Sequence, residues 1–259
     1  MSKMTYIPFE EESEEIKERV EGYWTERAES FFVQKQHELE SDKAQKWLGE
    51  ILTKIKTSFP GRDKSDIRIL DVGCGAAFFT VLLGKEGFNV TGIDLTPEMI
   101  AKADNMLELN GPYEGEVEVK VMDAENLDFA DGSFDILITR NLTWTLPHPV
   151  EAYHEWARVL KEGGLLLNFD AEYAKGDHNL NNQDNLAHKC VSDKLKEECH
   201  EIYHMLTISS LDRPQWDGEV LKAAGFGDVN LDTEFYSRIY DKMDEFYIPD
   251  KMFMIAASK

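Results

Sequence analysis

Residues 69–75 read Ile-Leu-Asp-Val-Gly-Cys-Gly, and this stretch decides the fold. A short apolar run ends in an acid and two glycines, and an apolar pattern of helical period follows from Phe78 to Gly87. The pattern predicts a strand, a tight turn and a helix. Glycine at positions 73 and 75 permits backbone angles that other residues avoid and lets a ligand lie against bare backbone. We therefore expect this turn to hold a ligand.

The residues around the turn indicate which ligand it holds. A site for a nicotinamide dinucleotide has a third glycine, which allows close helix packing beside the pyrophosphate, and this chain has Phe78 at that position. Asp71 would also repel a pyrophosphate, because it is an anion just before the turn. An acid suits a cationic ligand, and S-adenosylmethionine (SAM) carries an ammonium and a sulfonium group and no phosphate.

The run from Leu70 to Gly75 resembles the first motif of the class I SAM-dependent methyltransferases. The resemblance implies an α/β, Rossmann-like sheet of seven mostly parallel strands with helices on both faces. It also implies SAM as the cofactor and S-adenosylhomocysteine as the product. Asp71, Gly73 and Gly75 are then expected to contact the cofactor.

Composition limits the classes of partner. The chain has 259 residues and 42% apolar content, which fits one large α/β domain better than two small ones. A net charge of −22 would repel the phosphates of nucleic acids, so we expect no nucleic-acid partner. Three widely spaced cysteines and the lack of a signal-peptide or membrane-span pattern lead us to expect a cytoplasmic protein without disulfides or membrane contact. The oligomeric state stays open.

Residues 1–63 are expected to form a helical lid segment ahead of the main domain. One charged helix is predicted over Glu10–Ser30 and a second, with an apolar stripe, over 41–60. The run Tyr-Trp-x-x-Arg-Ala from Tyr23 resembles a stretch that closes over SAM in many small-molecule methyltransferases. The resemblance implies that Tyr23 and Arg27 contact the cofactor. The alternative is that these residues only dock the helix on the core.

Acidic residues follow two further predicted strands. Asp94 ends the second strand, one helix after the glycine turn, and a carboxylate there can accept hydrogen bonds from both ribose hydroxyls. Leu95 and Met99 would then flank the adenine; the alternative is that both residues belong to the core. The resemblance implies that Asp123 and Ala124, after the third strand, meet the adenine amino group and a ring nitrogen.

A fourth strand is predicted over 134–139, apolar on both faces as a central parallel strand should be. Arg140 and Asn141 follow at its carboxyl end, where ligands bind in open α/β sheets, so both are assigned to the cofactor. This segment lacks the Asx-Pro-Pro-aromatic signature of methyltransferases that act on amide or base nitrogens. Such substrates are therefore disfavoured. The acceptor pocket is assigned to Trp144, Tyr173 and His178.

The main domain is expected to span residues 64–259. Strand five, predicted over 165–170, is followed by residues 174–209, which are longer than an ordinary connection and are expected to cover the acceptor. The closing pieces are predicted as a helix over 216–224, a strand over 228–235 and a final strand over 252–257.

Methyl transfer is an in-line displacement that depends chiefly on positioning, so no catalytic residue is assigned. Tyr173, His178 and His148 are the candidate bases for a protonated acceptor. His200 and His204 share a helix face without a third ligand at standard spacing, so no metal site is expected. The sequence predicts a SAM-dependent methyltransferase for a small molecule, most similar to the quinone-biosynthesis branch. The alternatives are a protein or peptide methyltransferase and a SAM-binding sensor without turnover.

Overall fold

The computed structural model describes residues 10–173, 186–189 and 191–259. Its centre is a seven-stranded sheet in the order β3-β2-β1-β4-β5-β7-β6. β3, β2, β1, β4 and β5 run parallel, and β7 is antiparallel to its neighbours β5 and β6. The predicted Rossmann-like sheet is confirmed. The strands are β1 Arg68–Val72, β2 Asn89–Asp94, β3 Val117–Val121, β4 Phe134–Arg140, β5 Leu160–Asp170, β6 Val229–Asp232 and β7 Phe253–Ser258.

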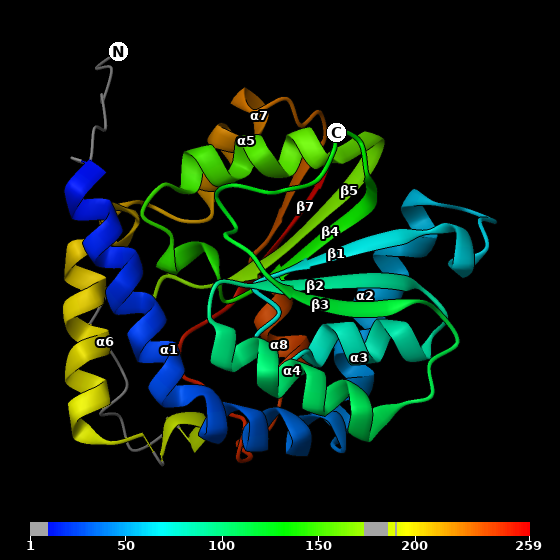
Figure 1. Cartoon of the computed structure of the whole chain (residues 1–259). Helices are drawn as coiled ribbons and strands as arrows, with labels where there is room; N and C mark the ends of the chain where they lie inside the picture. The colour runs from blue at the N-terminus through cyan, green and yellow to red at the C-terminus, as the bar shows by residue number, and fades with distance from the viewer. Residues whose placement is uncertain (1–9, 174–185, 190) are drawn as a thin grey trace.

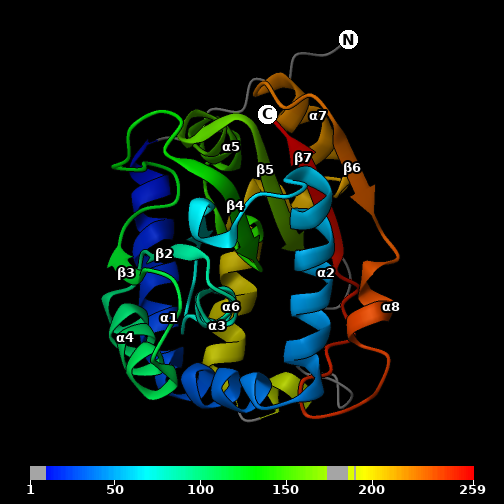
Figure 2. The same cartoon turned by 90° about the vertical axis from the view of Figure 1, so that its right-hand side faces the viewer.

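Helices cover both faces of the sheet (Figures 1 and 2). One face carries α2 Asp42–Ser58, α3 Phe78–Lys85, α4 Pro97–Asn110 and α8 Phe235–Ile239. The other face carries α5 Pro149–Val159 and α7 Gln215–Ala223. Two further helices, α1 Glu10–Leu39 and α6 Asp193–Met205, lie side by side across one end of the sheet.

Side chains fill the space between the sheet and the helices. On the α2 face, the fully buried Trp47 ring lies 5.2 to 5.3 Å from the rings of Phe79, Phe169 and Phe235. The face under α5 is packed around Tyr153 and Trp156, which are also fully buried. The central strands are apolar on both faces because helices cover both, as parallel sheets require.

Two element boundaries differ from the prediction near the ends of helices. α1 continues to Leu39 instead of ending at Ser30, because Phe32 and Lys35 continue its buried face. β5 begins at Leu160, before the predicted start, and its pairing with β4 shifts register between Phe134 and Ile136.

The predicted strand over 228–235 is wrong in its second half. β6 ends at Asp232, and the chain then forms the short helix α8. Phe235, the first residue of α8, is fully buried against Trp47, so packing in the core decides the local structure there. Within the described part of the chain, no helix is both long and apolar enough to cross a bilayer.

Candidate functional site

A cavity of about 170 Å³ lies at the carboxyl ends of β1, β2 and β4. Residues of the turn after β1, of the ends of β2, β3 and β4, and of the segment after α8 line it. α1 and α6 also contribute side chains, so the cavity is enclosed between the sheet and two helices that lie far apart in the sequence. This is the edge at which open α/β sheets bind ligands.

The glycine turn lies directly under α1. Gly73 and Gly75 have φ angles of +67° and +52°, in the left-handed region that favours glycine. A Cβ atom at position 75 would lie 2.9 Å from Cε1 of Phe31, which belongs to α1. At position 73 it would lie 2.8 Å from Cδ1 of Leu142. Both glycines are thus required by the backbone angle and by close neighbours.

Asp71, at the end of β1, is almost completely buried beside the turn. Its Oδ2 accepts hydrogen bonds from the backbone N–H of Thr80 at 3.1 Å and from the Thr80 hydroxyl at 2.7 Å. Burial raises the pKa of Asp71 to about 7, although the Thr80 donors oppose the rise. A cationic group in the cavity would therefore favour the ionised form of this carboxyl group.

Asp94, at the end of β2, is held by two backbone donors. The N–H of Gly75 donates to its Oδ2 and the N–H of Thr96 to its Oδ1, both at 3.0 Å. Burial raises the pKa of Asp94, and the two backbone hydrogen bonds oppose this rise. Each carboxylate oxygen retains capacity for a further donor, so the group can accept a pair of hydroxyls.

Asp123, after β3, is paired with α1. Lys17 places its Nζ 2.7 Å from Oδ2 of Asp123 and 2.6 Å from Oε2 of Glu125. Glu125 also accepts a hydrogen bond from the backbone N–H of His148 and contacts its Nδ1 at 3.0 Å. α1 is thus tied by charge to the end of β3. His148, a candidate base, is held by Glu125 at the start of α5.

A buried charge cluster lies where the second half of α1 crosses β4. Arg140 donates from Nη2 to Oε1 of Glu38 at 2.8 Å and to the Tyr240 hydroxyl at 3.1 Å. Lys35 donates to Oε2 of Glu38 at 2.5 Å. The Arg140 guanidinium also stacks 4.3 Å from the centre of the Trp47 ring.

Aromatic side chains form the wall nearest β5. The Trp144 ring stacks on Tyr203 of α6 at 4.6 Å and meets Tyr173 edge-on at 5.4 Å. The Tyr173 hydroxyl donates to Oδ1 of Asn141 at 2.6 Å. Burial raises the pKa of Tyr173 well above its ordinary value, so this phenol does not act as a base near neutral pH.

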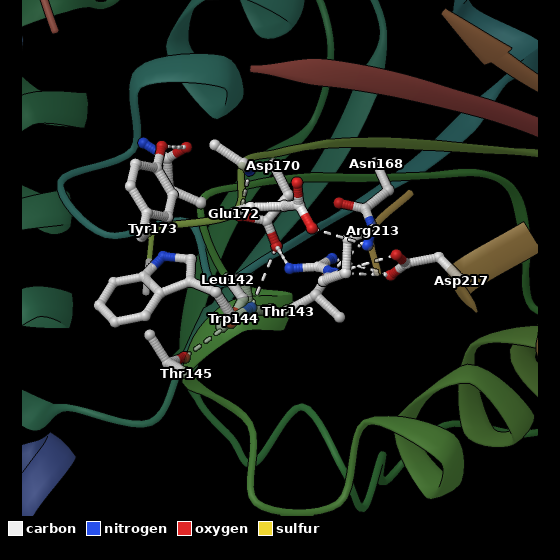
Figure 3. A network of polar contacts seen from close by, with 12 residues as sticks. Leu142, Thr143, Trp144, Thr145, Asn168, Asp170, Glu172, Tyr173, Arg213 and Asp217 are labelled. Carbon is white, nitrogen blue, oxygen red and sulfur yellow. Dashed lines mark hydrogen bonds and ion pairs between the residues drawn. The ribbon is translucent and has the colours of Figure 1, made fainter. Parts of the chain in front are cut away.

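A buried ion network holds the backbone of Trp144 (Figure 3). Oδ2 of Asp170 accepts from the backbone N–H of Trp144 and from Nη1 of Arg213, both at 3.0 Å. Arg213 also makes a forked contact to Asp217, and the Tyr153 hydroxyl donates to the same carboxylate. The network joins the end of β5 to α5 and α7, and it fixes the backbone that carries Trp144.

The structure brings most of the residues proposed from the sequence to the same cavity. Those that line it are Tyr23, Asp71, Gly73, Gly75, Asp94, Leu95, Met99, Asp123, Ala124, Arg140, Asn141, Trp144 and Tyr173. Arg27 is not among the lining residues: it is buried and donates to the hydroxyl of Ser30. His178 and most of the predicted insertion before α6 lie outside the described residues.

Several lining residues had no signal in the sequence analysis. They are Lys17, Phe31, Lys35, Glu38, Tyr203 and Tyr240. Lys35 and Glu38 lie beyond the predicted end of the first helix, so the predicted boundary at Ser30 left both residues out of it. Tyr240 and Tyr203 come from segments whose position depends on tertiary packing, and no local pattern marks them.

Comparison with known families bears on this site. Residues 70–168 match the family model described as "Methyltransferase domain". The match begins within β1 and ends within β5, so it includes the glycine turn and the ends of β2, β3 and β4, which line the cavity.

Two curated relatives match part of the chain. A 2-methyl-6-phytyl-1,4-hydroquinone methyltransferase from Synechocystis sp. (strain ATCC 27184 / PCC 6803 / Kazusa) is 36% identical over 100 residues, covering 38% of this chain and 30% of the relative. An S-adenosyl-L-methionine-dependent Diels-Alderase from Neonectria sp. (strain DH2) is 30% identical over 168 residues, covering 64% of this chain and 61% of the relative. In both cases the match spans less than two thirds of the relative.

Solved structures share the fold over most of the chain. A SAM-dependent methyltransferase from Thermotoga maritima, described as a possible histamine N-methyltransferase, superposes with a TM-score of 0.57 and 18% identity. The superposition covers 92% of this chain and 99% of the other. At 18% identity, the likeness supports a shared fold and nothing further.

Proposed function

We propose, from the premise that residues 70–168 belong to the class I SAM-dependent methyltransferases, that the whole chain binds SAM in this cavity and methylates a small-molecule acceptor. The observation that carries the proposal is the placement of Asp94. Two backbone N–H groups, one of them from the glycine turn, fix its carboxylate at the cavity edge. That arrangement suits the two hydroxyls of a ribose.

The other lining residues are proposed for the rest of the cofactor. Asp71 and the backbone of Gly73 and Gly75 take the methionine part, together with Arg140 and Asn141 at the end of β4. Leu95 and Met99 take the faces of the adenine ring. Tyr23 covers the cofactor from α1, and Asp123 and Ala124 receive the edge of the adenine.

The acceptor is proposed to lie beside Trp144 and Tyr173. In an in-line displacement the acceptor atom approaches opposite the sulfonium at about 3 to 3.5 Å, and positioning supplies much of the rate. Residues 1–63 act as the lid segment in this proposal, and residues 64–259 form the catalytic domain with the 174–209 insertion near the acceptor. A cavity covered by α1 and α6 favours a small acceptor over a peptide segment, and the quinone-type relative supports the same class.

SAM binding without methyl transfer is the second candidate. The relative from Neonectria sp., which is 30% identical over 168 residues, is named as a SAM-dependent Diels-Alderase. The cavity accommodates either activity, because both use the same cofactor seat. Turnover of labelled SAM with pooled metabolites separates the two: labelled product supports transfer, and SAM binding without labelled product supports the second candidate.

Asp94→Ala tests the cofactor site. The substitution removes two charge-assisted hydrogen bonds to the ribose, each worth about 1.5 to 3 kcal/mol, so calorimetry should show at least a tenfold loss in affinity for S-adenosylhomocysteine. The affinity of Asp94→Asn for S-adenosylhomocysteine should lie between that of Asp94→Ala and that of the parent. In the parent, S-adenosylhomocysteine at about 100 times its Kd should stabilise the fold by about 2.7 kcal/mol, and NAD should not. Unchanged affinity in Asp94→Ala would show that the ribose does not use this carboxylate.

A further inference from the structure

The buried cluster of Lys35, Glu38 and Arg140 carries more positive than negative charge. Two cations share one carboxylate, and the side chain of Glu38 is only 1% exposed. Burial opposes ionisation of Glu38, but Arg140 and Lys35 outweigh it and lower its pKa to about 2. Glu38 is therefore fully ionised and already used by both cations.

The pKa of Lys35 is also shifted in this cluster. Burial and the nearby charge of Arg140 lower the pKa of this ammonium group to about 8, although Glu38 opposes the change. Asp71, the further acid that Arg140 influences, accepts hydrogen bonds from Thr80, and burial raises its pKa to about 7, which disfavours its charged form.

Unused donors accompany the extra charge. Nε and Nη1 of Arg140 are buried and have no hydrogen-bond partner among the described residues. Both Arg140 and Lys35 line the cavity. Buried donors are nearly always paired in native proteins, so these two N–H groups are suited to an acceptor group that a ligand brings.

We infer that Lys35 and Arg140 form a binding site for one anionic group, a carboxylate or a phosphate, of a molecule that occupies the cavity. The inference rests on the proposed function, since the anion belongs either to the amino-acid part of the cofactor or to the acceptor. If the anion belongs to the cofactor, Lys35 makes the cofactor contact that was predicted for Arg27. Because Lys35 belongs to α1, the anion also holds α1 against the end of β4.

Lys35→Met is the test variant, because it leaves Glu38 and Arg140 as a balanced pair. The ligand-free variant is expected to melt no lower than the parent. Lys43→Met is the matched control: Lys43 is equally buried, lies 5.0 Å from the centre of the Tyr240 ring and is not among the cavity-lining residues. Lys35→Arg should restore the behaviour of the parent.

Two probes identify the source of the anion. S-adenosylhomocysteine carries the amino-acid group, and 5′-methylthioadenosine has the same nucleoside and thioether without it. If the cofactor supplies the anion, Lys35→Met weakens S-adenosylhomocysteine at least tenfold and leaves 5′-methylthioadenosine unchanged. If the acceptor supplies it, both affinities are unchanged, and acetate or inorganic phosphate raises the Tm of the S-adenosylhomocysteine complex in the parent but not in Lys35→Met.

Two results would overturn the inference. One is a Lys35→Met variant that matches the parent in all these measurements. The other is an equal loss in Lys43→Met. A parent that binds neither nucleoside but gains Lys35-dependent stability from phosphate or acetate would support the anion site and contradict the proposed function.

Discussion

At the scale of single residues, Asp71 links the cavity to pH. Its folded pKa of about 7 lies above the ordinary carboxyl value, because the group is buried. An acid with a raised folded pKa destabilises the fold as pH rises, and this cost develops between the unfolded value near 4 and about 7. A nearby ammonium group of the ligand would lower that pKa and favour the ionised form.

The affinity for S-adenosylhomocysteine should therefore fall as the pH drops below about 7, because the protonated Asp71 no longer attracts the ammonium group. Calorimetry between pH 5.5 and 8.5 measures this dependence. Asp71→Asn keeps the shape of the side chain and should bind more weakly with a flatter pH profile. A variant that retains the pH profile of the parent would assign the titration to another group.

The residues of the site differ in how far the sequence could predict them. Asp94 and Gly75 belong to a local strand and turn pattern, and the structure joins them by a hydrogen bond at 3.0 Å. Lys35 depends on the length of α1 and on its crossing angle over β4, and no local pattern contains that information. Arg27 was proposed from a motif, but the rotation of α1 buries it away from the cavity.

At the scale of elements, α1 makes the contact that closes the site over the glycine turn. Tyr23 and Phe32 are buried, and Phe31 lies against Gly75. The sequence predicted a charged helix over Glu10–Ser30. The structure shows that α1 has a buried apolar face. Moving α1 away from the site would therefore cost more free energy than moving a loosely docked helix.

Gly75→Ala should separate α1 from the turn. The new methyl group would lie 2.9 Å from the Phe31 ring, and the φ angle of +52° adds strain of about 1 kcal/mol for a residue with a side chain. Hydrogen exchange should show faster exchange of the α1 amides in this variant.

A double-mutant cycle supplies the control. Phe31→Ala should cost less unfolding free energy in the Gly75→Ala background than in the parent, since the clash is relieved. If Phe31→Ala costs the same unfolding free energy in both backgrounds, the ring and the turn are not coupled, and the role of α1 as a cover for the turn would be wrong.

At the scale of the whole molecule, the sheet was the most predictable feature. Each parallel strand follows a local pattern, and the short connections restrict the order in which strands can pair. The pattern failed where packing decides the structure: α8 forms because Phe235 fills a gap beside Trp47. The sequence did not predict the contacts that enclose the cavity for the same reason, because these contacts join segments that are distant in the chain.

The Arg213 network joins the end of β5 to α5 and α7. Arg213 is buried between Asp170 and Asp217, which are both completely buried. Arg213→Met would leave two buried carboxyl groups without their cation, so we expect a loss of about 3 to 5 kcal/mol in the free energy of unfolding. Urea denaturation measures the loss.

Arg238→Met is the matched control for that experiment. Arg238 pairs with Glu50 and Asp232 at the surface, and its side chain is 38% exposed. Exposed ion pairs contribute about 1 kcal/mol or less, so this variant should remain close to the parent. Similar losses in the two variants would contradict the assignment of a special role to the buried network.

The pairing of α1 with α6 has a consequence for the order of biosynthesis. Arg19 and Glu198, which join the two helices, are 179 residues apart. A ribosome adds about 5 to 20 residues per second, so α1 waits roughly 10 to 35 s for its neighbour to be made. During that interval the face that carries Ile16 and Tyr23 has no α6 to cover it. α1 thus leaves the ribosome long before its contacts with α6 can form.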